Sequence, residues 1–123
     1  MAEETDEEYQ RLEAAIARAS AKHMSNAKWV ALFDLLRRAG VIELRWKFVR
    51  DSRIFSANVP AQSDLRDTGL ADVMPSPYAE FRELEWVEVP AEKRLGLEPW
   101  LSGEKQFPWQ ESDTGLRVVA YTW

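Results

Sequence analysis

Glutamates crowd a short segment that contains a single basic residue, Arg82; they are Glu80, Glu83, Glu85, Glu88 and Glu92. If residues 83–89 form a strand, Glu83 and Glu85 point to one face, because side chains two positions apart share a face. Two carboxylates at this spacing repel each other, hold a hard cation or bind a basic partner. An ordinary charged sheet edge, which discourages unwanted strand pairing, accounts for the same residues. We predict Glu83 and Glu85 as partner-binding residues and keep the solvated edge as the alternative.

The sequence Asp-Thr-Gly-Leu occurs twice, at 67–70 and at 113–116. Aspartic proteases place Asp-Thr-Gly in two loops whose aspartates share a proton and act as acid and base. In this chain polar residues precede each Asp, where such an enzyme has an apolar strand, and 123 residues are too few for two lobes. We therefore expect two turns in which the Asp side chains bond to nearby backbone and both Gly69 and Gly115 adopt positive φ.

The chain has no cysteine and a single histidine, His23. Disulfides, thiolate nucleophiles and histidine-rich metal sites are therefore excluded. The acidic residues do not show the spacing of a known metal-binding loop, so we predict neither a metal nor a cofactor.

Basic residues gather between positions 37 and 53, where Glu43 and Asp51 are the only acids; they are Arg37, Arg38, Arg45, Lys47, Arg50 and Arg53. Such a patch can bind phosphate groups or an acidic protein. The whole chain has a formal net charge of -5, however, so we expect these residues to pair internally with the glutamates or with the first helix. The same net charge disfavours nucleic acid and anionic membranes as partners.

Six tryptophans point to packing and recognition rather than to catalysis. Three of them lie on predicted apolar faces and are expected in the core: Trp29, Trp46 and Trp86. A polar, proline-containing segment further along the chain carries Trp100, Phe107 and Trp109. Aromatic side chains on a rigid backbone are typical of a binding hot spot, and we predict these three as partner-binding residues. The alternative is a segment that folds back as a lid over the sheet, since exposed indoles are a liability.

The elements that position these residues follow from the apolar periodicity. One-face spacing predicts a main helix at about 26–39, capped by Ser25 or Asn26 and ended by Gly40. Alternation predicts a strand at 41–48 with Arg45 and Lys47 on its wet face, and a hairpin back to residue 59. We expect residues 61–77 to form a long excursion with one short helical turn, and 93–112 to be irregular.

Two further strands are predicted at 83–89 and 116–123. The segment before the first of these strands is helix-like in pattern, with Tyr78 and Phe81, and the alternation within the strand slips at Trp86 and Val87. A slip of this kind predicts a bulge that turns Leu84 and Trp86 to one face and the following valines to the other.

The first helix is expected to begin near Asp6, with an apolar seam that runs through Tyr9, Leu12, Ile16, Ala19 and His23. We interpret residues 1–23 as an N-terminal helical appendage and residues 24–123 as a single α+β domain. In that domain an antiparallel sheet of about four strands packs against the main helix. We expect the first helix to lie on the edge of this domain, to pair with a second copy or to fray.

Two segments of the chain resemble an uncharacterised group of small bacterial proteins that share a Ser-Asn-x-Lys-Trp opening. The first runs from Ser25 to Trp29 and is followed by Leu32, Phe33 and Leu36, and the second runs from Phe81 to Trp86. The resemblance implies a bacterial, cytosolic domain of unknown function and assigns no catalytic residue. A cytoplasmic location also fits the lack of cysteine, the acidic N-terminus, which is unlike a secretory signal, and apolar runs too short to span a bilayer.

Three functions follow as expectations. The first is a non-catalytic protein-binding module, an inhibitor or immunity-type antidote for example, that uses the acidic edge and the Pro-Trp segment. The second is a small hydrolase in which Glu83 or Glu85 works with Arg45, which requires these groups to converge in a concave pocket. The third is a homodimer that pairs through the N-terminal helix and takes no ligand.

Overall fold

A computed structural model describes residues 2–73, 76–97, 99 and 107–123. The helices are α1 (Ala2–Ala17), α2 (Asn26–Arg38) and the single turn α3 (Arg94–Leu97), and the 3-10 turns are η1 (Gln62–Asp64), η2 (Phe81–Glu83) and η3 (Ala91–Lys93). The strands are β1 (Ala21–Lys22), β2 (Glu43–Phe48), β3 (Phe55–Asn58), β4 (Gly69–Val73), β5 (Ser76–Glu80), β6 (Leu84–Pro90), β7 (Trp109–Glu111), β8 (Gly115–Val119) and β9 (Tyr121–Thr122).

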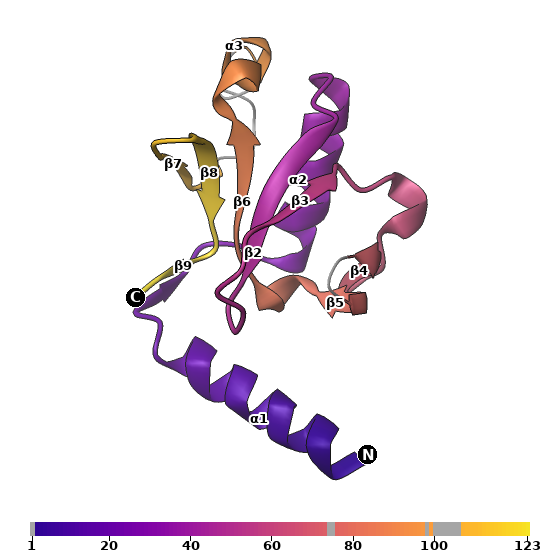
Figure 1. Ribbon diagram of the computed structural model, residues 1–123, viewed down its shortest axis with the longest axis vertical. Coiled ribbons are helices and arrows are strands. Elements are labelled where there is room, and N and C mark those ends of the chain that lie inside the picture. Colours follow the sequence, from indigo (N-terminus) through magenta and orange to yellow (C-terminus); the bar gives the residue numbers. More distant parts are fainter. Residues whose placement is uncertain (1, 74–75, 98, 100–106) are drawn as a thin grey trace.

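The main sheet is antiparallel with the strand order β3-β2-β6-β8-β7, and α2 lies behind it in Figure 1. Two small sheets, β1-β9 and β4-β5, complete the described strands. The α+β class is therefore confirmed, and the sheet has five strands rather than about four. The added strand is β7, in the segment that was expected to be irregular.

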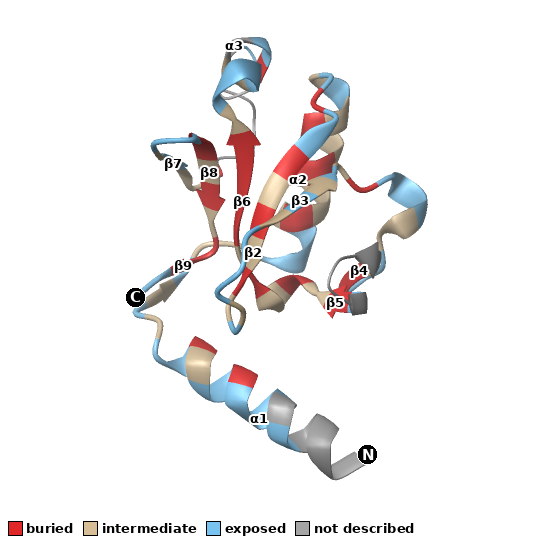
Figure 2. Cartoon of the chain, in the orientation of Figure 1, coloured by how far each residue is buried: buried red, intermediate tan, exposed pale blue. Residues whose placement is uncertain are grey.

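Helix α2 forms as the sequence predicts. The Ser25 side chain accepts a hydrogen bond from the Lys28 backbone N–H, and Gly40 after the helix has a φ of 80°. Its buried residues Trp29, Leu32, Phe33 and Leu36 meet the apolar face of the sheet. Figure 2 shows the buried residues concentrated on α2 and on the central strands.

The bulge in β6 lies one residue earlier than expected, at Glu85. Lys47 is opposite Trp86 and Phe48 is opposite Leu84, so Glu85 is the extra residue. Leu84 therefore shares the core face with Val87 and Val89, whereas Trp86 points to the other face. The prediction that Leu84 and Trp86 share a face is wrong. Trp29 and Trp46 are core residues as expected, but Trp86 is buried outside the core cluster.

Residues 61–80 are more regular than expected. The helical turn exists as η1, but β4 and β5 form a hairpin that includes Tyr78, which was expected to be helix-like. Pro77 is tolerated because β5 belongs to a two-stranded sheet, where one edge needs no backbone donor.

The last strand changes sheets at Ala120. β8 belongs to the main sheet, and β9 pairs instead with β1, so that Ala21 faces Thr122. Tyr121 is buried, and its hydroxyl donates a hydrogen bond to the Arg82 carbonyl at 2.6 Å. A single continuous strand over 116–123 was therefore the wrong expectation.

Helix α1 begins at Ala2, ahead of the expected start near Asp6, and lies below the sheet in Figure 1. Leu12 and Ile16 are buried and belong to the same core cluster as α2 and the sheet. Arg82 lies 4.4 Å from the centre of the Tyr9 ring and forms an ion pair with Glu13. In the described part of the chain, no helix has the length and apolar character needed to cross a membrane.

Candidate functional site

One carboxylate organises the face of the main sheet that points away from α2. Glu88 lies at the middle of β6, and its side chain is 1% exposed. In register, Glu88 is opposite Arg45 of β2 and Arg117 of β8. Arg45 Nη2 lies 2.6 Å from Glu88 Oε1, and Arg117 Nε lies 2.7 Å from Oε2. Cross-strand pairing therefore places one buried acid between two arginines.

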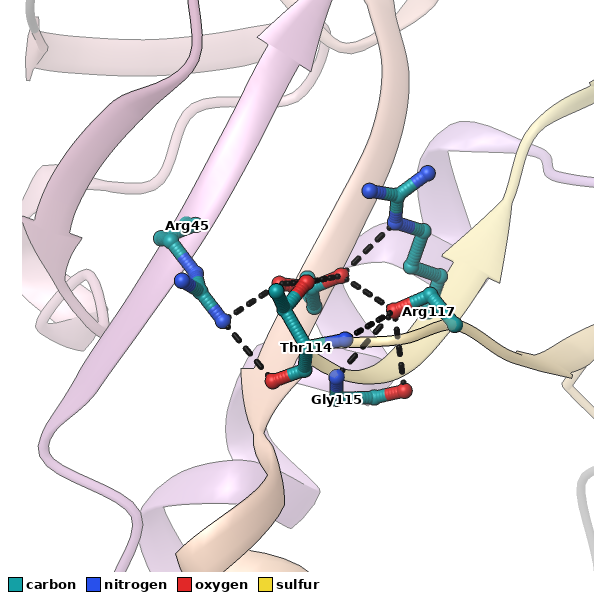
Figure 3. A network of polar contacts seen from close by, with 6 residues as sticks. Arg45, Thr114, Gly115 and Arg117 are labelled. Carbon is teal, nitrogen blue, oxygen red and sulfur yellow. Dashed lines mark hydrogen bonds and ion pairs between the residues drawn. The ribbon is translucent and has the colours of Figure 1, made fainter.

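Two hydroxyl groups from the turn between β7 and β8 complete this network. Ser112 Oγ donates to Glu88 Oε2 at 2.6 Å, and Thr114 Oγ1 lies 3.0 Å from both carboxylate oxygens. The turn is fixed in return, because Arg45 Nη2 donates to the Thr114 carbonyl at 2.9 Å and Gly115 N donates to Ser112 Oγ (Figure 3). The network thus joins three strands and one turn.

The charge state of Glu88 follows from these contacts. Burial by itself would raise its pKa, but the hydrogen bonds from Ser112, Arg117 and Thr114 and the charge of Arg45 outweigh burial, so the pKa is lowered. Glu88 is therefore ionised at neutral pH. Both of its oxygens are already occupied by donors, which leaves no lone pair to accept a proton from a substrate. This carboxylate fixes the two arginines in place and is poorly suited to act as a general base.

Arg117 is held on two sides but keeps part of its guanidinium available. Its Cζ lies 3.9 Å from the centre of the Trp86 ring, a close cation–π contact that covers Trp86 on the open face. Only Nε is engaged by Glu88, and Figure 3 shows the two Nη atoms of Arg117 turned away from the network. The side chain is 30% exposed. Among the described residues, no polar partner is assigned to these two nitrogens.

Three hollows follow one another along this face. The largest, of about 640 Å³, lies between β3 and the turn before β8; its lining includes Glu43, Glu92 and Asp113. The second, of about 460 Å³, lies over the Glu88 network and is lined by both Arg45 and Arg117. The third, of about 320 Å³, has Trp86 and Arg117 in its wall; we call it the Arg117 pocket.

Comparison of the chain with protein-family models, curated proteins and solved structures found no match.

The predicted site residues Glu83 and Glu85 do not share a face. Glu83 lies in η2, where its carboxylate accepts a hydrogen bond from the backbone N–H of Glu80 in a capping box. Glu85 is the bulge residue of β6, and its Oε2 lies 2.7 Å from Lys47 Nζ. The expected repulsive or cation-binding pair of carboxylates is therefore replaced by a cap and an ion pair.

The aromatic residues of the Pro-Trp segment lie mainly against the core. Phe107 is buried, and Trp109 is partly buried and packs against the same core from the edge strand β7. Their rings meet edge to face with centroids 6.2 Å apart. Trp100 lies outside the described residues. Phe107 and Trp109 thus have the arrangement of a lid, and their role in partner binding stays a prediction.

The convergence that the hydrolase interpretation required is not present in the predicted form. Arg45 pairs with Glu88, while Glu85 pairs with Lys47. Among the described residues, no group of three or more His, Asp or Glu side chains is placed to hold a metal ion.

The repeated Asp-Thr-Gly-Leu sequence has a different structural basis from the one expected. Gly69 opens β4 and Gly115 opens β8, far apart in Figure 1, and neither has a positive φ. A Cβ atom would lie 2.1 Å from the Ala79 carbonyl oxygen at Gly69 and 2.1 Å from the Val89 carbonyl oxygen at Gly115. Glycine is required there because two strand backbones approach closely, so the prediction of positive φ is wrong.

Sequence reasoning placed Arg45 on the wet face of its strand but missed Glu88, Arg117 and the two hydroxyl residues. The usable signal was an acid between two valines of one strand and an arginine at an alternating position of another. These residues are brought together by the register of three strands that are far apart in the sequence, and this register cannot be read from the sequence.

Proposed function

We propose that the protein is a non-catalytic protein-binding module whose partner docks on the open face of the main sheet. The observation that carries the proposal is the fixed polar surface around Glu88, on a sheet face without a second layer among the described residues. A soluble sheet normally covers or solvates such a face with mobile side chains. Here the guanidinium groups are held in place before any partner arrives, which reduces the entropy cost of binding.

The distribution of charge on this face favours a protein partner over nucleic acid. The largest hollow is lined by Glu43, Glu92 and Asp113, for which no ion pair is found among the described residues, and the whole chain has a net charge of -5. Carboxylates at this end would repel a phosphate backbone. Arg45 also lines this hollow but is paired with Glu88, and Arg117 lies at the opposite end, so a partner with its own two-ended charge pattern fits this face in one orientation.

The saturated state of Glu88 supports a binding role more than a catalytic one. A carboxylate that accepts from four side chains and is almost fully buried can hold its neighbours, but it offers nothing to a substrate. Small size and acidity agree with an inhibitor or immunity-type antidote of a bacterial cytoplasm, which is the form of binding module that we propose.

The homodimer interpretation has less support, because the seam that a helix pair would use is already occupied. Leu12 and Ile16 are buried within the chain, and Tyr9 lies beneath Arg82. Pairing of two copies through α1 would have to use its charged outer side.

The test uses a Ser56→Arg variant, which places a long cation at the mouth of the largest hollow. Ser56 is exposed on β3 and lines this hollow, and Ser63 on η1 is exposed and provides a matched Ser63→Arg control away from the face. A partner recovered in equimolar amount with the full chain should bind Ser56→Arg about tenfold more weakly in calorimetry and bind the control like the wild type. Recovery of no equimolar partner at any salt concentration, or equal binding by both variants, would overturn the proposal.

A further inference from the structure

The Arg117 pocket combines a cation with an apolar floor. Trp86 forms the floor beneath the guanidinium, and the lining continues through Val119, Tyr121, Trp123 and Gln110. Trp123 is 53% exposed, and its ring centre lies 5.4 Å from that of Tyr121. One end of the pocket therefore offers hydrogen-bond donors, and the other offers exposed aromatic surface.

Among the described side chains that line the Arg117 pocket, each acid has a basic partner, and Arg117 is the one cation. Glu85 pairs with Lys47, and Glu111 pairs with Arg94, so these two acids of the lining are compensated. Glu88 is shared by two arginines, so these three side chains together carry one positive charge in excess. This excess is carried where the Nη atoms of Arg117 face away from the network (Figure 3).

The orientation of Arg117 is fixed from two directions. Nε donates to Glu88, and the guanidinium plane lies over Trp86, so the two Nη atoms are presented in one geometry. Two parallel N–H donors on a planar guanidinium match the two oxygens of a carboxylate. Since this fork is oriented in advance, a ligand does not have to order a long side chain.

We propose that the Arg117 pocket binds a single carboxylate that carries an apolar group beside it, supplied by a polypeptide segment of the partner. The inference rests on the proposed function, because it names the chemical group that the partner brings. A carboxylate has one negative charge and matches the single guanidinium that lines the Arg117 pocket. A phosphate group has nearly two and would bring this larger charge into a pocket that is also lined by Glu85 and Glu111.

The probe is N-acetyl-leucinate, which carries a carboxylate next to an apolar side chain. Acetate lacks the apolar group, N-acetyl-leucinamide lacks the charge, and inorganic phosphate tests the other anion. Each is titrated into the full chain while ¹H–¹⁵N spectra follow the Arg117 Nε–H and Trp86 Nε1–H signals. We expect N-acetyl-leucinate to shift both signals, and we expect acetate and the amide to bind about tenfold more weakly.

The decisive variant is Gln110→Glu. Gln110 is exposed, lies opposite Arg117 in register and lines the pocket, so a carboxylate there would compete for the Nη atoms without disturbing Glu88. Gln10→Glu on the exposed side of α1 makes the same change in net charge elsewhere. N-acetyl-leucinate should bind Gln110→Glu about tenfold more weakly and bind Gln10→Glu like the wild type.

Three results would overturn this inference: binding of the amide as tight as that of the acid, tighter binding of phosphate than of the acid, or unchanged binding by Gln110→Glu. The outcome is separable from that of the proposed function. A partner that binds wild type and Gln110→Glu equally would leave the module intact and remove the carboxylate site. If the chain binds N-acetyl-leucinate but recovers no partner, the carboxylate site would stand and the proposed binding module would be overturned.

Discussion

Arg45 on β2 and Arg117 on β8 bind the two oxygens of one carboxylate from opposite sides, because these two strands flank β6 in the sheet. The carboxylate belongs to Glu88 on the strand between them. This relationship ties the stability of the sheet to the shape of its open face.

Glu88→Gln should be strongly destabilising, because it leaves two guanidinium groups facing a neutral amide. We expect a loss of about 2–3 kcal/mol, below the 3–5 kcal/mol of a fully buried pair, since both arginines remain about one-third exposed. Glu85→Gln, which breaks one pair with Lys47, should cost about 1 kcal/mol or less. Urea unfolding of the two variants measures the difference, and equal losses would contradict the assigned role of Glu88.

Glu88 should also shape the acid limb of the stability curve. Its pKa in the folded chain is lowered from the ordinary value of 4.5, so the unfolded chain takes up the proton more readily. The stability contributed by Glu88 is therefore present above pH 4.5 and is lost as the pH falls below it through the folded pKa. The free energy of unfolding, measured from neutral pH into this range, should fall less steeply in Glu88→Gln than in the wild type. Identical slopes would count against a lowered pKa.

Ile16→Ala tests whether α1 is part of the core. Ile16 is 4% exposed, and removal of a buried isoleucine side chain should cost about 2–5 kcal/mol. Ile42 is 69% exposed, so Ile42→Ala should change stability by no more than about 0.5 kcal/mol. Thermal unfolding of both variants checks the contrast. If Ile16→Ala behaved like Ile42→Ala, α1 would not be packed as described.

Gly115→Ala tests the close approach of β8 and β6 beside the Glu88 network. An added Cβ would meet the Val89 carbonyl oxygen, so a loss of about 1–3 kcal/mol or more is expected. In Gly96→Ala, by contrast, the Cβ meets nothing within 4 Å and lies in the helical turn α3, where alanine is favoured by about 0.5–1 kcal/mol. Urea unfolding distinguishes the two, and a neutral Gly115→Ala would show that the strands can separate there.

Local patterns were sufficient to predict the main helix, the first hairpin and the apolar face of β2. In these elements the cap, the apolar periodicity and the turn residues all lie within a few residues of one another, as with Ser25 and Lys28. The same reasoning failed at β6, because the position of its bulge depends on pairing with Phe48 rather than on its own alternation. It also failed at Ala120, where pairing of β9 with β1 breaks an otherwise regular strand.

The candidate site was harder to predict than the fold, because its parts are distant in sequence. Arg45, Glu88 and Arg117 are brought together only by the register of three strands. Glu83 and Glu85 looked more suitable, since they are close in sequence and acidic. Glu83 instead lies in the 3-10 turn η2, where it caps Glu80, and Glu85 is the bulge residue of β6, where it pairs with Lys47.

The short ladder of β1 and β9 has a mechanical consequence. Ala21 is paired with Thr122, and Lys22 with Tyr121. A pulling force applied through the residue before Ala21 and the residue after Thr122 therefore acts on the same end of this antiparallel ladder. Its bonds would open one after another instead of sharing the tension. By contrast, β8 is hydrogen-bonded to β6 on one side and to β7 on the other. Under a pulling force, the β1-β9 ladder should therefore open first, while the strands of the main sheet remain paired.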